Sequence, residues 1–280
     1  MSPEEYVSFD DLQISKVKNL IDEFEEELIH MSGQCMDIGC GPGDVTKNIL
    51  LPALDPNAVI LEGTDVSKNM IEFAKKTYGN EKRLKFEVLD IQTKSLPEKY
   101  ISGFDHIFSF HALHWCYNIQ QALENIYCML RPGGSILLLI VATHDIFEVM
   151  KIMAQDFRFA EYIQDVKKYI SPFNDSAEPR KKLRKLLKNI GFEVHHCSLR
   201  ETTYSSKNSN HFLSSIISIY PFLDKMPHDR KEEFKKEFTR EFEERKITYK
   251  TIQNNQEQTF VLDLYKILIV NAQKKYNNIA

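Results

Sequence analysis

The chain has 280 residues, 42% of them hydrophobic and 27% charged, with a formal net charge of −4 at pH 7. This length can bury a sizeable core, and the composition is that of an ordinary globular protein. The acidic balance argues against nucleic acid as a partner, because proteins that bind phosphates usually carry a basic face. No apolar run approaches the roughly 20 residues that span a bilayer, so we expect a cytoplasmic protein without stable membrane insertion.

Five cysteines occur without a C-x-x-C pair, and no secretory signal peptide precedes them. This pattern favours a reducing compartment and argues against a disulfide framework or a zinc site, so no metal is expected. No segment repeats or is of low complexity, and we expect one domain over residues 1–280.

In chain order, residues 1–30 predict an N-terminal helical segment, because their apolar side chains recur on one face. Strands and helices then alternate through residues 34–142. The expected strands are 34–39, 58–63, 84–89, 104–110 and 135–141, and the expected helices are 44–51, 67–78 and 119–130. This alternation predicts an α/β fold with a doubly wound, mostly parallel sheet that binds ligands at the carboxyl ends of its strands.

The second half of the chain is less regular. Segments 143–190 and 205–257 are predicted to be mainly helical insertions. Residues 191–204 and 258–273 are predicted to form two closing strands, which makes a sheet of seven strands. The expected helices of this half are 178–190, which Gly191 ends, 207–222, and 227–250, which carries a stripe of Phe234, Phe238 and Phe242. The insertions would form a cap over the substrate, and a hydrophobic cap suits a greasy acceptor.

A glycine-spaced turn follows the first strand, in Met36-Asp37-Ile38-Gly39-Cys40-Gly41-Pro42-Gly43-Asp44. Glycine lets the backbone close on a ligand and adopts positive φ without cost. The N–H groups at the start of the next helix attract a negative or lone-pair-rich group. The spacing is G-x-G-x-G and not the dinucleotide fingerprint G-x-G-x-x-G, whose third glycine would fall at Asp44.

Carboxylates stand at the ends of three successive strands: Asp37, Asp65 and Asp90. Asp65 follows Gly43 by 22 residues, a distance at which a carboxylate can accept both ribose hydroxyls of a cofactor. Each acid alone could be a helix cap or a turn residue, but together they predict a cofactor site. A dehydrogenase would explain Asp65, but neither the glycine spacing nor Asp90.

These motifs resemble the class I S-adenosylmethionine-dependent methyltransferases, whose first motif reads acid-x-G-x-G-x-G. The resemblance implies a Rossmann-like sheet with an antiparallel last strand, and S-adenosyl-L-methionine as cofactor. In such a protein Asp90 would hold the adenine amino group beside an apolar neighbour, and Ser109 would offer backbone groups to the methionine amine. The cofactor-binding residues it implies are Asp37, Gly39, Gly41, Gly43, Asp65, Val66, Asp90, Ile91 and Ser109.

Three further stretches, 108–115 (FSFHALHW), 170–173 (ISPF) and 220–227 (YPFLDKMP), resemble the juvenile hormone acid methyltransferases of arthropods. The resemblance implies that Gln13 and Trp115 are catalytic and hold the carboxylate of a sesquiterpenoid acid, such as farnesoic acid or juvenile hormone acid. We expect His114 beside them in the substrate site. The chain departs from the family at His111, where an aromatic residue is usual.

The chemistry of a carboxylic acid substrate is consistent with a glutamine and a tryptophan in the site. A carboxyl group with a pKa of roughly 4 is ionised at pH 7, so methyl transfer needs no general base and mainly requires positioning. Gln13 and Trp115 would each donate a neutral N–H. An arginine would bind the carboxylate harder, but it would also draw charge from the attacking oxygen.

Two alternatives stay open. The acceptor could be another fatty or terpenoid acid or a small phenol, although a phenol would need a base or a metal. The chain could also be a non-catalytic protein of the same fold that binds cofactor or lipid. Methylation of RNA or DNA fits less well, because no N-P-P-aromatic motif follows the fourth strand. The oligomeric state stays open.

Overall fold

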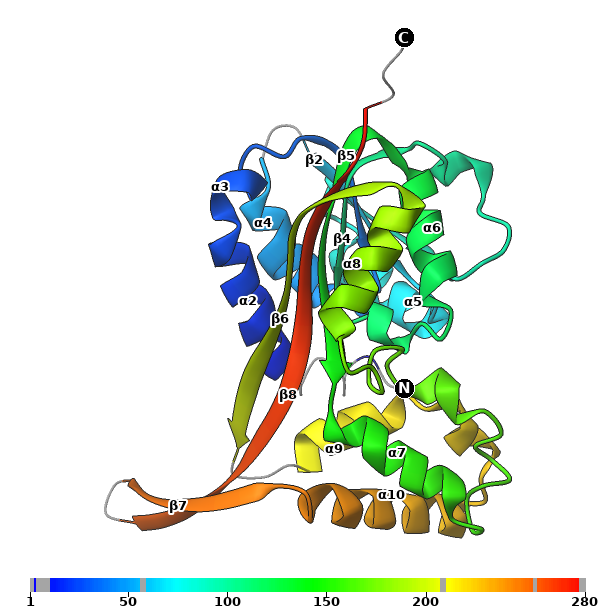
Figure 1. Cartoon of the computed structure of the whole chain (residues 1–280), viewed down its shortest axis with the longest axis vertical. Helices are drawn as coiled ribbons and strands as arrows, with labels where there is room; N and C mark the ends of the chain where they lie inside the picture. Colours follow the sequence, from blue (N-terminus) through cyan, green and yellow to red (C-terminus); the bar gives the residue numbers. More distant parts are fainter. Residues whose placement is uncertain (1–2, 4–10, 56–58, 207–209, 254–255, 277–280) are drawn as a thin grey trace.

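The fold is seen in a computed structural model, which describes residues 3, 11–55, 59–206, 210–253 and 256–276. A mixed sheet forms its centre (Figure 1), with strand order β3-β2-β1-β4-β5-β8-β6 and β7 paired to β8. β1 to β5 run parallel, and β8 runs antiparallel to β5, β6 and β7. The strands are β1 (Gly33–Ile38), β2 (Val59–Asp65), β3 (Leu84–Val88), β4 (Phe104–Phe110), β5 (Leu130–Thr143), β6 (Phe192–Ser206), β7 (Ile247–Gln253) and β8 (Gln256–Lys274).

Helices cover both faces of this sheet. One face carries α2 (Asp11–Glu23), α3 (Glu25–Leu28), the π-helical η1 (Thr46–Leu50), α4 (Leu51–Ala53) and α5 (Lys68–Tyr78), and the other carries α6 (Ile119–Met129) and α8 (Pro179–Ile190). Side chains of β5 alternate between the two cores, as the two-residue period of a strand requires: Leu137 joins one and Leu138 the other. The doubly wound, mostly parallel α/β fold with an antiparallel last strand is confirmed.

Local signals in the sequence account for several helix boundaries. The Ser67 hydroxyl accepts the Met70 N–H at 3.4 Å and caps α5. Gly191, at φ +121°, ends α8. The predicted apolar face of the N-terminal helix is buried at Val17 and Phe24. The residues of that segment before Asp11, apart from Pro3, lie outside the described part of the chain.

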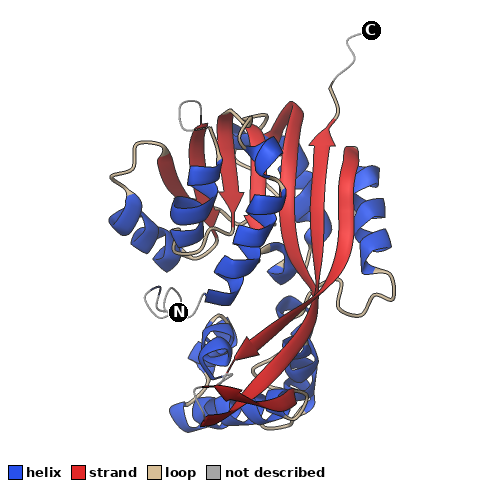
Figure 2. Ribbon diagram, turned by 90° about the vertical axis from the view of Figure 1, so that its left-hand side faces the viewer, coloured by secondary structure: helices blue, strands red, loops and turns tan. Residues whose placement is uncertain are grey.

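A second group of elements lies below the sheet in Figure 1, and β6 and β8 are long enough to continue into it (Figure 2). We call this group the cap. Its elements are α7 (Asp145–Gln155), the 3₁₀ turns η4 (Val166–Tyr169) and η5 (Pro221–Lys225), α9 (Asn210–Ser218), α10 (His228–Glu243) and the β7–β8 hairpin. The predicted stripe Phe234, Phe238 and Phe242 is buried on α10, where it packs in the cap core.

The sequence-based description of the cap was wrong in three places. The helix expected over 178–190 as part of the cap is α8, which packs on the sheet. The helix expected over 227–250 ends at Glu243, and Ile247–Gln253 forms β7, which makes the sheet eight-stranded and not seven-stranded. The run ITYKTIQ is rich in β-branched and aromatic residues, which is typical of a strand. In the insertion expected to be mainly helical over 143–190, the part before α8 contains only α7 and η4, with turns between them.

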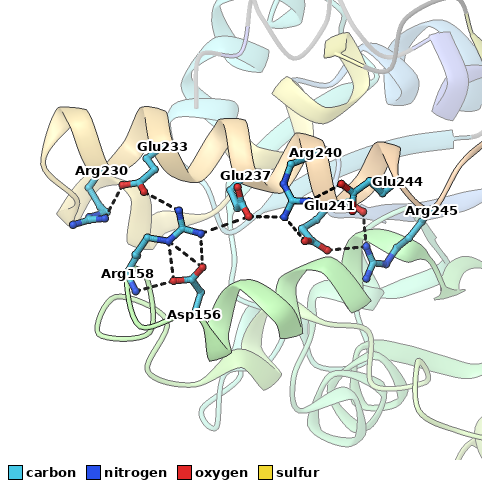
Figure 3. Close-up of polar contacts among 9 residues, drawn as sticks. All are labelled: Asp156, Arg158, Arg230, Glu233, Glu237, Arg240, Glu241, Glu244 and Arg245. Carbon is cyan, nitrogen blue, oxygen red and sulfur yellow. Dashed lines mark hydrogen bonds and ion pairs between the residues drawn. The ribbon is translucent and has the colours of Figure 1, made fainter.

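Ion pairs join the loop after α7 to α10 (Figure 3). Arg158 contacts Asp156 at 2.5 Å and Glu233 at 2.8 Å, and further pairs run along α10 through Arg240. These side chains are partly exposed, so each pair contributes little stability. The network fixes how the loop and α10 lie against each other.

The buried ammonium group of Lys246 links the cap to the sheet through two ion pairs. Its side chain is 1% exposed, and Nζ lies 2.5 Å from both Asp145 Oδ2 and Asp263 Oδ1. His144 Nε2 reaches the other oxygen of Asp263 at 3.0 Å. Burial acts to raise the pKa of Asp263, but His144 and Lys246 outweigh it and lower that pKa.

We expect Lys246→Met to lower the free energy of unfolding by about 3 kcal/mol, because it leaves Asp263 buried with one partner fewer. Denaturant unfolding measures this change. Lys235→Met is the control, since the Lys235–Glu232 pair is exposed and its loss should matter little. Equal effects of the two substitutions would contradict a stabilising role for Lys246.

Candidate active site

The glycine turn is built as its spacing predicts. Gly39, Gly41 and Gly43 all have positive φ, at 76°, 55° and 86°. A Cβ at Gly39 would lie 2.0 Å from the Ala112 Cβ, so no side chain fits there. The N–H groups of Gly39 and Cys40 both donate to the Thr64 carbonyl, which ties the turn to the end of β2.

Asp37, at the end of β1, is buried at 2% exposure and accepts a hydrogen bond from the Thr46 hydroxyl at 2.6 Å. Burial raises the pKa of Asp37 to about 7; the bond from Thr46 opposes this rise, and the carboxylates of Asp65 and Asp44 add to it. Burial also raises the pKa of Asp65 and Asp44. Within the described residues no Lys, Arg or His forms an ion pair with these three acids, so the cluster favours a cationic ligand.

The carboxyl ends of β1, β2 and β3 bring the three predicted acids to one edge of the sheet. Asp65 accepts the N–H groups of Gly41 at 3.1 Å and Ser67 at 2.8 Å, and these bonds fix its orientation. Asp90 is exposed and accepts the N–H of Gln92 at 2.9 Å. The apolar residues that follow Asp65 and Asp90 differ in exposure: Val66 is 68% exposed, whereas Ile91 is buried in the core.

A small pocket lies between the glycine turn, α2 and the end of β4. It is lined by Val17, Asp37, Gly39, Cys40, Gly41, Pro42, Asp44, Val45, Phe110 and His111. Ser109, one residue before Phe110, is fully buried, and its hydroxyl donates to the Ile38 carbonyl at 2.8 Å. This hydrogen bond links β4 to β1, so the Ser109 side chain stabilises the sheet.

His111 is an unusual residue in this pocket. Its φ of +55° lies in the left-handed region, which strains any residue other than glycine. Its Nε2 is buried without a hydrogen-bond partner among the described residues. Burial and the nearby Lys16 ammonium lower the pKa of His111 to about 4, so the ring is neutral at pH 7. Strain and an unpaired nitrogen together indicate a functional position.

Trp115 and His114 lie on the 3₁₀ turn η3 (Leu113–Trp115), where the core meets the cap. The Trp115 ring contacts His114, Phe147 and Tyr220, with centroids 4.8, 5.8 and 6.1 Å apart. His114 is 4% exposed, and burial, with His111 and His144 nearby, lowers its pKa well below the ordinary value. These two predicted substrate residues, which are adjacent in the sequence, therefore lie at the boundary between the core and the cap, with His114 neutral.

Gln13 belongs to α2, but its side chain lies outside the described residues. Val17, one helical turn later, lines the pocket, so the backbone of this helix passes beside it. Sequence reasoning did not assign Asp44 and Tyr220 to the site. The sequence could have indicated Asp44, which is an acid at the start of the helix after the glycine turn. For Tyr220 the only indication was its place in the 220–227 motif.

Among the residues that the structure describes, no group of three or more His, Cys, Asp or Glu side chains could hold a metal ion. No helix in the same part of the chain is both long and apolar enough to cross a membrane. All five cysteines are free thiols.

Comparisons with known proteins agree with this geometry. Residues 36–136 match the family model of a methyltransferase domain. The chain is 34% identical over 273 residues to juvenile hormone acid O-methyltransferase of Drosophila melanogaster, covering 96% of this chain and 91% of that protein. It is 30% identical over 239 residues to the protein of the same name from Bombyx mori, covering 85% and 84%.

Among solved structures, the YcgJ protein of Bacillus subtilis matches with a TM-score of 0.53 at 16% identity, covering 92% of this chain and 99% of that one. At this identity the likeness shows the fold alone. The relatives that match nearly the full length carry the assignment. The chain therefore belongs to the juvenile hormone acid O-methyltransferase family, within the class I S-adenosylmethionine-dependent methyltransferases, and is an enzyme of that class.

Proposed function

We propose that this enzyme transfers the methyl group of S-adenosylmethionine to the carboxylate of a sesquiterpenoid acid, farnesoic acid or juvenile hormone acid, and releases the methyl ester. The observation that carries the proposal is the neutral pair His114 and Trp115, placed between the acidic glycine turn and an aromatic cap. The full-length relatives, which are named for such an acid, support the same substrate class.

The residues around the glycine turn fit this cofactor. Asp37 and Asp44 form no ion pair among the described residues, so their carboxylates suit its positive charges, and the fixed carboxylate of Asp65 suits its ribose hydroxyls. The exposed Val66 is free to lie against the adenine ring, with Asp90 at the amino group; Ile91 is already packed in the core. Bound S-adenosylmethionine would supply an electrophilic methyl group on sulfur.

The substrate side requires orientation and not proton transfer. A carboxylate oxygen forms the new bond to the methyl carbon as the carbon–sulfur bond breaks, so no proton has to move. His114 and Trp115, with Gln13 from α2, would hold the carboxylate by neutral donors. Orientation of this kind can contribute about 7–11 kcal/mol to lowering the barrier.

Trp115→Phe keeps an aromatic ring but removes the indole N–H. We expect kcat/KM for the acid to fall about 10- to 100-fold, the value of a hydrogen bond to a charged group, while cofactor affinity stays unchanged. Initial rates and calorimetric binding of S-adenosylhomocysteine measure the two effects. Tyr117→Phe is the control, because Tyr117 is exposed. Parallel loss of turnover and cofactor binding would mean that Trp115 only supports the fold.

The direct test is mass-spectrometric detection of methyl esters. Purified protein is incubated with S-adenosylmethionine and either farnesoic acid, juvenile hormone acid, saturated fatty acids or a phenol. Ester from the sesquiterpenoid acids alone supports the proposal, and ester from the fatty acids would widen the substrate class. Bound cofactor with no product from any acid would favour a non-catalytic protein of the same fold.

A further inference from the structure

A row of four rings leads from the pocket at the glycine turn into the cap: His111, His114, Trp115 and Tyr220. Successive ring centroids are 6.4, 4.8 and 6.1 Å apart. In three of these residues a buried polar atom has no hydrogen-bond partner within the described part of the chain: His111 Nε2, His114 Nδ1 and the Tyr220 hydroxyl. Native proteins pair nearly all buried polar groups. Of the nine such unpaired atoms among the described residues, three lie in this one row, which begins at the pocket, and this grouping indicates groups that contact a ligand.

Tyr220 is the member of this row that the cap supplies. It lies between α9 and η5 and is 3% exposed. Its ring packs against Trp115, Tyr169 and Phe222, with the latter two centroids 5.8 and 5.5 Å away. Burial raises the pKa of Tyr220 far above its ordinary value, so the hydroxyl stays protonated and can donate. An unpaired hydroxyl in such apolar surroundings destabilises the protein unless a ligand accepts its hydrogen bond.

We propose that the Tyr220 hydroxyl donates a hydrogen bond to the substrate carboxylate, from the cap side of Trp115, and thereby favours acids over their methyl esters. The proposal rests on the proposed function. A carboxylate has two oxygens and about four acceptor sites, so one oxygen can be held while the other attacks. A hydrogen bond to an ionised group is roughly twice as strong as one to a neutral group. The neutral ester product therefore accepts a weaker hydrogen bond from Tyr220 than the ionised acid does.

The chain contains one tryptophan, Trp115, so its fluorescence reports on this site directly. Wild-type protein, Tyr220→Phe and Tyr169→Phe are titrated with farnesoic acid and with methyl farnesoate, in the presence of S-adenosylhomocysteine so that no turnover occurs. Tyr169→Phe is the matched control, because it removes a hydroxyl from a ring that packs against Tyr220. Thermal unfolding is measured in parallel.

We expect Tyr220→Phe to weaken binding of the acid about ten-fold, to change binding of the ester less than two-fold, and to leave Tm equal or higher. Tyr169→Phe should keep the wild-type ratio of acid to ester affinity. If Tyr220→Phe keeps the wild-type ratio of acid to ester affinity, the proposed role of Tyr220 is wrong. The proposed function would still stand as long as the wild type esterifies farnesoic acid. If the wild type neither binds nor esterifies farnesoic acid, the proposed function itself fails.

Discussion

In the proposed cofactor site, S-adenosylmethionine should bind roughly 25-fold more tightly at pH 7.5 than at pH 5.5, because Asp37 would have to lose a proton to bind a cationic ligand. The pKa of Asp37 in the ligand-free protein is raised to about 7 by burial, with Asp65 and Asp44 contributing. Below pH 7 binding must first remove that proton, which weakens the apparent affinity about ten-fold per pH unit. Above pH 7 the affinity should level off.

Isothermal titration calorimetry in two buffers of different ionisation enthalpy measures both the affinity and the protons released. Asp37→Asn should weaken binding at pH 7.5 and remove most of the pH dependence; Asp65 and Asp44 belong to the same coupled cluster and account for the remainder. Glu72→Gln is the control, because its carboxylate is exposed on α5 and does not line the pocket. Equal affinity of the wild type at both pH values would refute the linkage.

The same raised pKa affects the stability of the ligand-free protein. Between pH 3.8 and 7 the folded chain holds a proton on Asp37 that the unfolded chain has lost, so the free energy of unfolding falls as pH rises through this window. The full fall is about 4 kcal/mol. Asp37→Asn should therefore be more stable than the wild type at pH 8, although it binds cofactor less well. Denaturant unfolding at pH 5.5 and 8 checks the sign.

Gly39→Ala should lower the free energy of unfolding by about 4 kcal/mol and abolish cofactor binding. The new Cβ would meet the Ala112 Cβ at 2.0 Å, an overpacking that costs about 1–3 kcal/mol. The φ of +76° at Gly39 adds about 1–2 kcal/mol of strain for any other residue. Denaturant unfolding and calorimetry with S-adenosylhomocysteine measure the two effects.

The double variant Gly39→Ala/Ala112→Gly separates these two causes. Removing the Ala112 methyl makes room for the new Cβ, so the double variant should be less destabilised than the sum of the single variants, with the backbone strain remaining. Gly103→Ala is the milder comparison, since the Cβ there would lie 3.3 Å from the Tyr100 carbonyl oxygen, a tight contact but far less severe than one of 2.0 Å. Additive effects would mean that the contact with Ala112 is unimportant.

The core of the fold could be predicted because its signals are local. Strand alternation through 34–142, the serine cap at Ser67 and the positive φ values of Gly39, Gly41 and Gly43 each depend on a few neighbouring residues. Parallel strands place their carboxyl ends at one edge, so the common position of Asp37, Asp65 and Asp90 at that edge could be predicted without further information. The cap was predicted less well, because Ile247–Gln253 becomes a strand only by pairing with β8.

The parallel strands, the glycine turn and the acids beside it follow from the sequence alone, since steric preferences and periodicity act over short stretches of chain. The protonation states in the site depend instead on how the whole chain packs. Burial keeps His111 and His114 neutral and raises the pKa of Asp37, and burial depends on the whole fold. The contact of Tyr220 with Trp115 likewise joins segments about a hundred residues apart, which only the packing of the cap on the sheet brings together.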